Sequence, residues 1–266
     1  MRASQDDLDF ALKMADLADE VTMAAFTGSA LHHETKLDGS PVTETDRQVE
    51  QALRDLVAES RPGDGFLGEE TGVVQGQHRR WIVDPIDGTQ SFIAGGEAWG
   101  TLVSLEDHQR VLVGVASAPV VGCRWWGADG IGAFGRTATD GPPRNLIATQ
   151  TSTLDQATWS CNPPIEALSG ARRSLAERLC AYGRYVEPEQ WTTHPVLMVA
   201  EGTMDICLAL EGEPWDYAAL VAILHAANGK FSYLDSSSEL GEAGPAIFSN
   251  HLLHDLVLEV LADGTP

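Results

Sequence analysis

Three groups of acidic residues, each beside an apolar segment, constrain this chain more than any other feature of its sequence. Glu69 and Glu70 follow a short apolar run, residues 84–87 (DPID) directly follow Trp-Ile-Val, and Asp216 begins a long apolar segment. A carboxylate at the end of a buried strand is costly unless it is paired or bound to a metal. Two carboxylates about 5 Å apart repel by about 3 kcal/mol at an effective dielectric constant of about 20. If the three groups meet in the fold, a hard divalent cation such as Mg²⁺ would remove that penalty.

The segment DPIDGT, residues 84–89, contains the most specific of these patterns. Its proline fixes φ and lacks an N–H group, so the chain turns sharply after the preceding strand. Asp84 and Asp87 can then point to one side, with the carbonyl of Ile86 between them. A helix can begin at the Gly-Thr pair that follows, and its free N–H groups would bind a phosphate. By itself the segment could be an ordinary Asp-Gly turn; the other acidic groups favour a metal and phosphate site.

The charge balance excludes one class of partner and supports the same site. The chain has 266 residues, 17 of them basic and 39 acidic, for a net charge of -22. Binding to nucleic acid needs a basic face, so we expect no nucleic-acid partner. An acidic surface also repels free phosphate, and a bound cation would reverse the local sign.

Three further patterns bear on the environment of the protein. The longest mostly apolar run, residues 111–122, is shorter than the roughly 20 residues that a membrane span needs. The N-terminus has no apolar signal region. Four scattered cysteines without a C-x-x-C pair indicate reduced thiols. We therefore expect a cytoplasmic protein with no membrane partner.

Hydrophobic periodicity predicts helices and strands that alternate in the second half of the chain, which indicates a layered α/β arrangement. The expected helices cover residues 6–26, 44–60, 167–181, 194–201, 215–228 and 250–262. The expected strands lie near residues 66–68, 81–83, 184–186, 204–210, 231–234 and 246–249, with several more in 99–136. A polar stretch over 137–165 is the best candidate for a domain boundary. Residues 130–135 match G-x-G-x-x-G, but no helix can follow them, so we interpret them as a hairpin turn.

Taken together, these motifs resemble those of the inositol monophosphatase family of metal-dependent phosphatases. The family's D-P-[IV]-D-G-T signature is at 84–89, its G-E-E element at 68–70, its W-D-x-A-[AG] element at 215–219 and V-T-x-x-D at 42–46. The basic residue Lys36 matches as well. The elements occur in the family's order across nearly the whole chain.

This resemblance implies a fold and an assembly. The expected fold is a layered αβαβα sandwich, with an α+β half at residues 1–145 and an α/β half at 146–266 that completes the site. Family members are usually homodimers, and we expect a homodimer here, with Trp125 and Trp126 as candidate interface residues.

The resemblance also implies the metal ligands. Glu69, Asp84 and the carbonyl of Ile86 would hold a first Mg²⁺. Asp84, Asp87 and Asp216 would hold a second, and a third, weaker ion would depend on Glu69 and water. Mn²⁺ could replace Mg²⁺. In such sites a metal activates water near neutral pH, and a second metal stabilises the leaving oxygen.

The remaining catalytic roles follow from the same resemblance. The backbone N–H groups of Gly88 and Thr89 would bind the phosphate. Thr89 and Asp46, assisted by Glu70, would orient the attacking water. The expected function is hydrolysis of a small phosphate monoester, without a covalent intermediate.

Within the family the sequence is most similar to actinobacterial-type histidinol-phosphate phosphatases, so histidinol phosphate is the first expected substrate and inositol 1-phosphate the second. Two positions depart from the family's substrate pattern: Ala209 replaces a usual Glu, and Trp191 replaces a usual Gly. Trp191 would either stack on a substrate ring or pack into the core. The candidate substrate residues are Lys36, Trp191, Thr193, His194 and Glu211.

The departures leave other functions open. A sugar, cyclitol or nucleoside phosphate of a specialised pathway, or a nucleotide bisphosphate, would also suit a reshaped pocket. A non-catalytic binding module that keeps the fold is the alternative from another class, and the intact acidic motifs argue against it.

Overall fold

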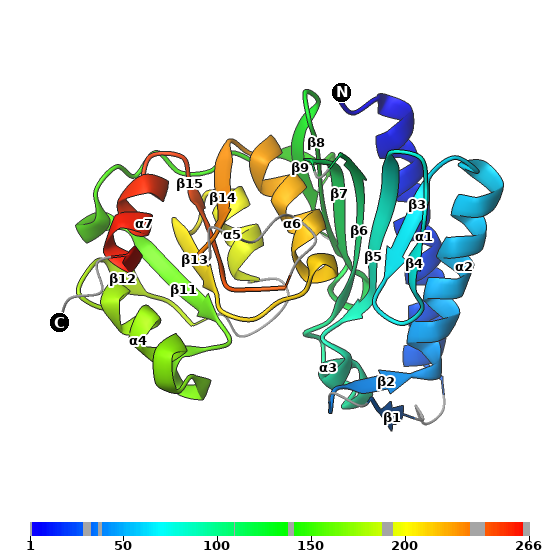
Figure 1. Ribbon diagram of the computed structural model, residues 1–266, viewed down its shortest axis with the longest axis horizontal. Helices are drawn as coiled ribbons and strands as arrows, with labels where there is room; N and C mark the ends of the chain where they lie inside the picture. The colour runs from blue at the N-terminus through cyan, green and yellow to red at the C-terminus, as the bar shows by residue number, and fades with distance from the viewer. Residues whose placement is uncertain are drawn as a thin grey trace.

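Helices and sheets alternate in five layers (Figure 1). The structure is a computed structural model that describes residues 2–28, 33–36, 39–108, 110–137, 141–187, 194–234 and 243–262. The outer helices are α1 (Gln5–Phe26) and α2 (Glu44–Ser60) on one side, and α4 (Gly170–Leu179) and α7 (His254–Ala262) on the other. Between the two sheets lie α5 (Pro195–Glu201) and α6 (Pro214–Ala226). The fold is therefore the expected αβαβα sandwich.

In the described residues the larger sheet has eight strands in the order β10-β9-β8-β7-β6-β5-β3-β4. They are β3 (Gly65–Gly68), β4 (Gly72–Val74), β5 (Arg79–Asp87), β6 (Gly100–Asp107), β7 (Arg110–Ala118), β8 (Cys123–Ala128), β9 (Gly132–Arg136) and β10 (Arg144–Asn145). Strands β3 and β5 are parallel, and the other pairs are antiparallel. Every residue of β6 is buried because helices cover both faces of this sheet.

The smaller sheet has five strands in the described part of the chain, in the order β12-β11-β13-β15-β14. They are β11 (Thr158–Asn162), β12 (Arg184–Tyr185), β13 (Ile206–Ala209), β14 (Gly229–Tyr233) and β15 (Ala246–Asn250). Below the larger sheet lie a short helix and a hairpin: α3 (Thr89–Ile93), β1 (His33–Thr35) and β2 (Pro41–Thr43). Single 3₁₀ turns occur at Pro119–Val121, Leu154–Gln156 and Ile165–Ala167.

Local signals explain where the prediction is accurate. Capping boxes at Ser4 with Asp7, and at Thr43 with Asp46, begin α1 and α2 within two residues of the expected starts. The glycine-rich segment forms the predicted hairpin turn between β8 and β9. The prediction missed β11, because its sequence TWSCN has little apolar alternation and lies in the stretch interpreted as a boundary.

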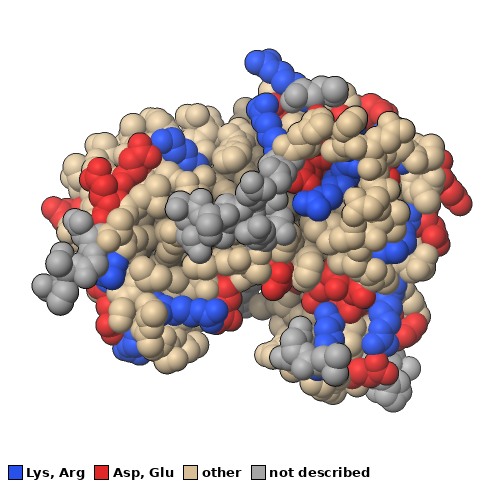
Figure 2. Space-filling model, viewed as in Figure 1, with Lys and Arg blue, Asp and Glu red and all other residues tan. Residues whose placement is uncertain are grey.

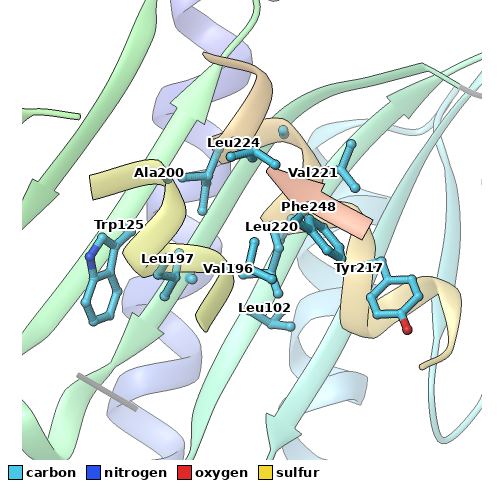
Figure 3. Packing of buried hydrophobic residues seen from close by; sticks show 14 of the residues in the cluster. Leu102, Trp125, Val196, Leu197, Ala200, Tyr217, Leu220, Val221, Leu224 and Phe248 are labelled. Atoms are coloured by element: carbon cyan, nitrogen blue, oxygen red, sulfur yellow. The ribbon is translucent and has the colours of Figure 1, made fainter. Parts of the chain in front are cut away.

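The central core forms around α6, which is apolar on every side because it lies between two sheets (Figure 3). Its side chains meet Leu102 of β6 and Phe248 of β15. At Gly114 of β7 the backbones approach so closely that an added Cβ atom would lie 2.1 Å from the carbonyl oxygen of Ala219. This contact sets the position of α6, and therefore of Asp216 in its first turn.

The structure corrects one expectation about the two tryptophans. Trp125 is only 2% exposed in the single chain, and its indole N–H donates to Glu201 at 2.6 Å. It joins β8 to α5 inside the molecule, so it is not a surface interface residue. Trp126 is half-buried and stacks on Phe134. No helix in the described residues is long and apolar enough to cross a membrane.

Candidate active site

Three acidic side chains from distant parts of the sequence meet at one end of the sandwich. Asp84 and Asp87 belong to the end of β5, and Asp216 lies in the first turn of α6. One carboxylate oxygen from each lies within 4.8 Å of those of the other two. They line a pocket of about 380 Å³, and acidic residues lie on both sides of the notch below the sheets (Figure 2). Its described lining residues are Lys36, Ser40, Glu69, Asp84, Ile86, Asp87, Gly88, Thr89, Glu213, Trp215 and Asp216.

The end of β5 is shaped to expose its polar atoms. The strand pairing is irregular between Asp84 and Asp87, where the proline interrupts the ladder. The N–H group of Ile86 donates to Asp84 Oδ1 at 3.0 Å, and Thr89 Oγ1 donates to the carbonyl oxygen of Ile86 at 3.0 Å. Thr101 Oγ1 donates to the carbonyl oxygen of Pro85 at 2.8 Å. These bonds hold the segment in one conformation.

Glycine is required at the position that precedes α3. Gly88 has φ +86°, a left-handed conformation, and an added Cβ atom would lie 2.5 Å from the carbonyl oxygen of Ala98. Helix α3 begins at Thr89, as the sequence predicts. Gly88 and Thr89 both line the acidic pocket, so this helix start borders it.

Burial and mutual repulsion favour the protonated forms of these carboxyls. Burial, then Asp216 and Glu69, raises the pKa of Asp87 to about 8. Burial raises the pKa of Asp216 to about 6, and burial with Glu69 and Asp87 raises the pKa of Asp84 well above its usual value. Hard oxygen ligands with an excess of negative charge fit a divalent cation, which would remove the repulsion.

A second group of charges borders the pocket. Lys36 Nζ lies 2.7 Å from Glu69 Oε1 and 2.5 Å from Glu70 Oε1. Burial raises the pKa of Glu70 to about 6, and these two bonds raise the pKa of Lys36 in spite of its burial. Asp46 is fully buried at the start of α2, where its Oδ2 accepts bonds from the N–H group and hydroxyl of Thr43. Its Oδ1 has no partner among the described residues.

The structure describes only some of the predicted substrate residues. Trp191 and Thr193 lie outside the described residues. His194 is partly buried at the start of α5, and burial lowers its pKa to about 4. Glu211 forms an ion pair with Arg172.

The structure also reveals residues that the sequence analysis did not select. Glu213 and Trp215 line the pocket, although Glu213 is out of register with the usual family position. Ala209, the residue at that position, is buried in the central core. Glu50 is buried beneath the Glu69-Glu70 turn. A glutamate four residues before Arg54 is typical of a solvated helix face, so no sequence signal marks its burial.

Comparison with known proteins shows the family to which the chain is similar. The model of the inositol monophosphatase family matches residues 4–264. The chain is 40% identical to a histidinol-phosphatase of Mycobacterium tuberculosis over 98% of this chain and all of the relative. It is 38% identical to a histidinol-phosphatase of Streptomyces coelicolor over 96% and 97% of the two chains. A Streptomyces griseus protein named glucose-1-phosphate thymidylyltransferase is 35% identical over 91% of each chain.

Solved structures show the same fold. An inositol monophosphatase from Zymomonas mobilis superposes with a TM-score of 0.78, 26% identity and coverage of 98% and 99%. Fold and site together define a phosphatase, a phosphoric monoester hydrolase. The chain belongs to the inositol monophosphatase family.

Proposed function

We propose that this protein hydrolyses histidinol phosphate with Mg²⁺ bound at the Asp84, Asp87 and Asp216 cluster. The observation that carries the proposal is the approach of these three carboxylates to within 4.8 Å in a pocket that also contains a helix start. Such a cluster is expensive to keep unless a cation binds it. The relatives named histidinol-phosphatases support the choice of substrate.

The proposed ligands are those that the resemblance implies. Glu69, Asp84 and the carbonyl of Ile86 would hold one ion, and Asp84, Asp87 and Asp216 a second. A third ion would depend on Glu69, and Mn²⁺ could replace Mg²⁺. When bound, the ions would activate water and stabilise the leaving oxygen.

The protein groups would bind and orient the reactants. The N–H groups of Gly88 and Thr89 would hold the phosphate. Asp46 Oδ1 is free to accept a hydrogen bond from the attacking water, because Thr43 occupies only Oδ2. Thr89 Oγ1 would accept a hydrogen bond from the same water, because its own proton is donated to the carbonyl oxygen of Ile86. Glu70 would assist by accepting a proton, since burial raises its pKa to about 6 and so makes its carboxylate a stronger base than usual.

The charge of the pocket favours a substrate with a cationic organic group. Among the described lining residues Lys36 is the only cation, and it already contacts Glu69 and Glu70. A second phosphate on the substrate would therefore lack a partner. Glu213 and the aromatic ring of Trp215 suit an ammonium or imidazolium group, such as those of histidinol phosphate.

A sugar phosphate or inositol 1-phosphate is the second candidate. The relative named glucose-1-phosphate thymidylyltransferase supports a sugar phosphate, and a relative from Caulobacter vibrioides named inositol-1-monophosphatase is 30% identical. Trp191, which replaces a usual Gly, would also suit a substrate whose ring differs from that of the family's ordinary substrate.

Phosphate release from a panel tests the substrate. The panel contains histidinol phosphate, inositol 1-phosphate, glucose 1-phosphate, glycerol 2-phosphate and fructose 1,6-bisphosphate, each with and without Mg²⁺. Glu213→Gln should raise the KM for histidinol phosphate and leave that for glycerol 2-phosphate unchanged. Glu211→Gln is the matched control, because Glu211 contacts Arg172 and does not line the pocket. Equal effects of both substitutions would contradict the proposed recognition.

We further propose a cytoplasmic homodimer whose chain divides into halves at residues 1–145 and 146–266. The family resemblance supports the dimer. The strand-free segment that connects β10 of the larger sheet to β11 of the smaller sheet supports the boundary. Light scattering after size-exclusion chromatography tests the dimer, and limited proteolysis tests the boundary.

A further inference from the structure

Glu50 lies beneath the turn that carries Glu69 and Glu70. It is on α2, one turn after Asp46, and its side chain is 0% exposed. Its Oε2 accepts a hydrogen bond from the N–H group of Glu70 at 2.7 Å, and its Oε1 accepts one from the N–H group of Thr71 at 2.8 Å. The hydroxyl of Thr71 also donates to Oε1. One carboxylate therefore binds two successive backbone N–H groups of this turn.

The fit between α2 and this turn is tight. An added Cβ atom at Gly68 would lie 2.2 Å from Cδ of Glu50, so a glycine is needed for the carboxylate to reach the backbone. Arg54 lies on the other side, with Nη2 3.7 Å from Glu50 Oε1. The same nitrogen donates to Thr71 Oγ1 and to the carbonyl oxygen of Gly72. The carboxylate is thus enclosed and fully hydrogen-bonded, which explains how a charge can be buried here.

The turn needs such an anchor because its own side chains repel their surroundings. Glu69 contributes to the raised pKa values of Asp84, Asp87 and Asp216. That repulsion pushes the turn away from the pocket. Lys36 offsets the repulsion only at Glu69 and Glu70, the two carboxylates with which it forms ion pairs. The bonds from Glu50 act on the backbone, so they do not depend on what occupies the pocket.

We propose that Glu50 is a positioning residue, which holds the Glu69-Glu70 turn at a fixed distance from Asp46 so that Mg²⁺ meets a preformed set of ligands. The inference rests on the proposed function, since it takes Glu69 as a metal ligand. Outer groups that orient metal ligands typically change metal affinity by about 10- to 100-fold when they are replaced. We expect Glu50 to act with that magnitude although it does not itself line the pocket.

The test measures Mg²⁺ binding without substrate, as the rise in Tm with Mg²⁺ concentration. Glu50→Gln keeps the shape but turns an amide NH₂ toward one of the two N–H groups, so one backbone bond is lost. We expect the Mg²⁺ concentration for half of the rise to increase by about 10- to 100-fold. In hydrogen exchange, the amides of Glu70 and Thr71 should exchange faster while the rest of α2 and β3 keep their protection.

Asp205→Asn is the matched control for a general loss of stability. Asp205 is also a buried carboxylate that accepts bonds from a backbone N–H group and a threonine hydroxyl, at Thr158, but it lies at the smaller sheet. It should lower the Tm and leave the Mg²⁺ midpoint unchanged. If Glu50→Gln shifts the Mg²⁺ midpoint no more than Asp205→Asn does, Glu50 is merely structural and the proposal is wrong.

Two further variants remove the remaining ambiguities. Thr71→Ala removes an exposed side chain, its bond to Glu50 and the bond that it accepts from Arg54, and it leaves both backbone bonds to Glu50 in place. It should therefore fold and raise the Mg²⁺ midpoint by a smaller factor. If Glu50→Gln does not fold, Thr71→Ala tests the role of Glu50 instead. An unchanged Mg²⁺ midpoint for Thr71→Ala would then overturn the proposal. Asp87→Asn should abolish the Mg²⁺ response; if the response persists, the proposed metal site has failed rather than the role of Glu50.

Discussion

The carboxylates of Asp87 and Asp216 approach to within 4.8 Å, although one ends β5 and the other begins α6. At about this separation two like charges repel by about 3 kcal/mol at an effective dielectric constant of about 20. Such a contact is unfavourable for stability in the absence of a cation, and it is favourable for binding one. Removing one of these carboxylates should therefore affect stability and cation binding in opposite directions.

Asp87→Asn should raise the Tm of the protein in EDTA and lower its Tm in Mg²⁺ relative to the wild type. At about pH 9, above the raised pKa of Asp87, the amide removes one charge from the cluster, so the Tm in EDTA should rise above that of the wild type. The stabilisation by Mg²⁺ and the phosphatase activity should both be lost. Thermal unfolding in EDTA and in Mg²⁺ measures the two effects. Asp9→Asn, at an exposed carboxylate of α1, is the control and should change neither value. A lower Tm in both conditions would show that Asp87 has only a structural role.

Mg²⁺ binding should release protons near pH 7. Burial and neighbouring carboxylates raise the pKa of Asp87 to about 8 and that of Asp216 to about 6, and Mg²⁺ requires the ionised forms. The apparent affinity should therefore fall as the pH is lowered from 8 to 6. Calorimetry at pH 7 in buffers of different ionisation enthalpy measures the released protons. Heats that are identical in all buffers would contradict this.

The same pKa shifts set the pH dependence of stability without metal. A carboxyl with a raised pKa binds its proton more tightly in the folded state, so folding gains stability as the pH falls through about 8. In EDTA the Tm should rise as the pH is lowered from 9 to 6.5. Saturating Mg²⁺ should flatten this slope over the same range, and a slope that is unchanged by Mg²⁺ would place the titrating groups elsewhere.

Gly114→Ala should disturb the site from a distance. Its Cβ atom would collide with the backbone of Ala219, which must shift α6 and with it Asp216. Overpacking of this kind typically costs about 1 to 3 kcal/mol of unfolding free energy. Urea denaturation should detect the loss, and the Mg²⁺ midpoint should rise. At Gly141 an added Cβ atom meets nothing within 4 Å, so Gly141→Ala should affect neither. Loss of stability with an unchanged Mg²⁺ midpoint would mean that α6 does not transmit the shift.

His254 should make the protein sensitive to acid. It bridges Ser232 and Ser249, with 2.8 Å from each ring nitrogen to a hydroxyl, and burial lowers its pKa to about 4. The fold favours the neutral ring, so stability is lost as the pH falls from 6.5 toward 4. His254→Gln should be less stable than the wild type at pH 7, and the gap should narrow at pH 5. Urea denaturation at both pH values measures it; a gap that stays constant would exclude His254 as the titrating group.

Local patterns account for most of what could be predicted. The capping residues Ser4 and Thr43 mark the starts of α1 and α2, because a cap involves atoms only three residues apart. The segment 84–89 predicts its own turn, since the proline and Gly88 restrict the backbone whatever surrounds them. The burial of Glu50 escaped prediction because it depends on β3, which approaches α2 only in the folded chain.

The sequence by itself therefore determined the family, the acidic motifs and the boundaries of α1 and α2, since these are properties of short segments. The tertiary structure decided which of those segments meet. It brings Asp216 to the end of β5 through the glycine contact between β7 and α6, directs Glu213 rather than Glu211 into the pocket, and sets Glu50 under the turn of Glu69. Those contacts join residues far apart in the chain, and their energies arise from packing and desolvation that exist only once the layers are assembled.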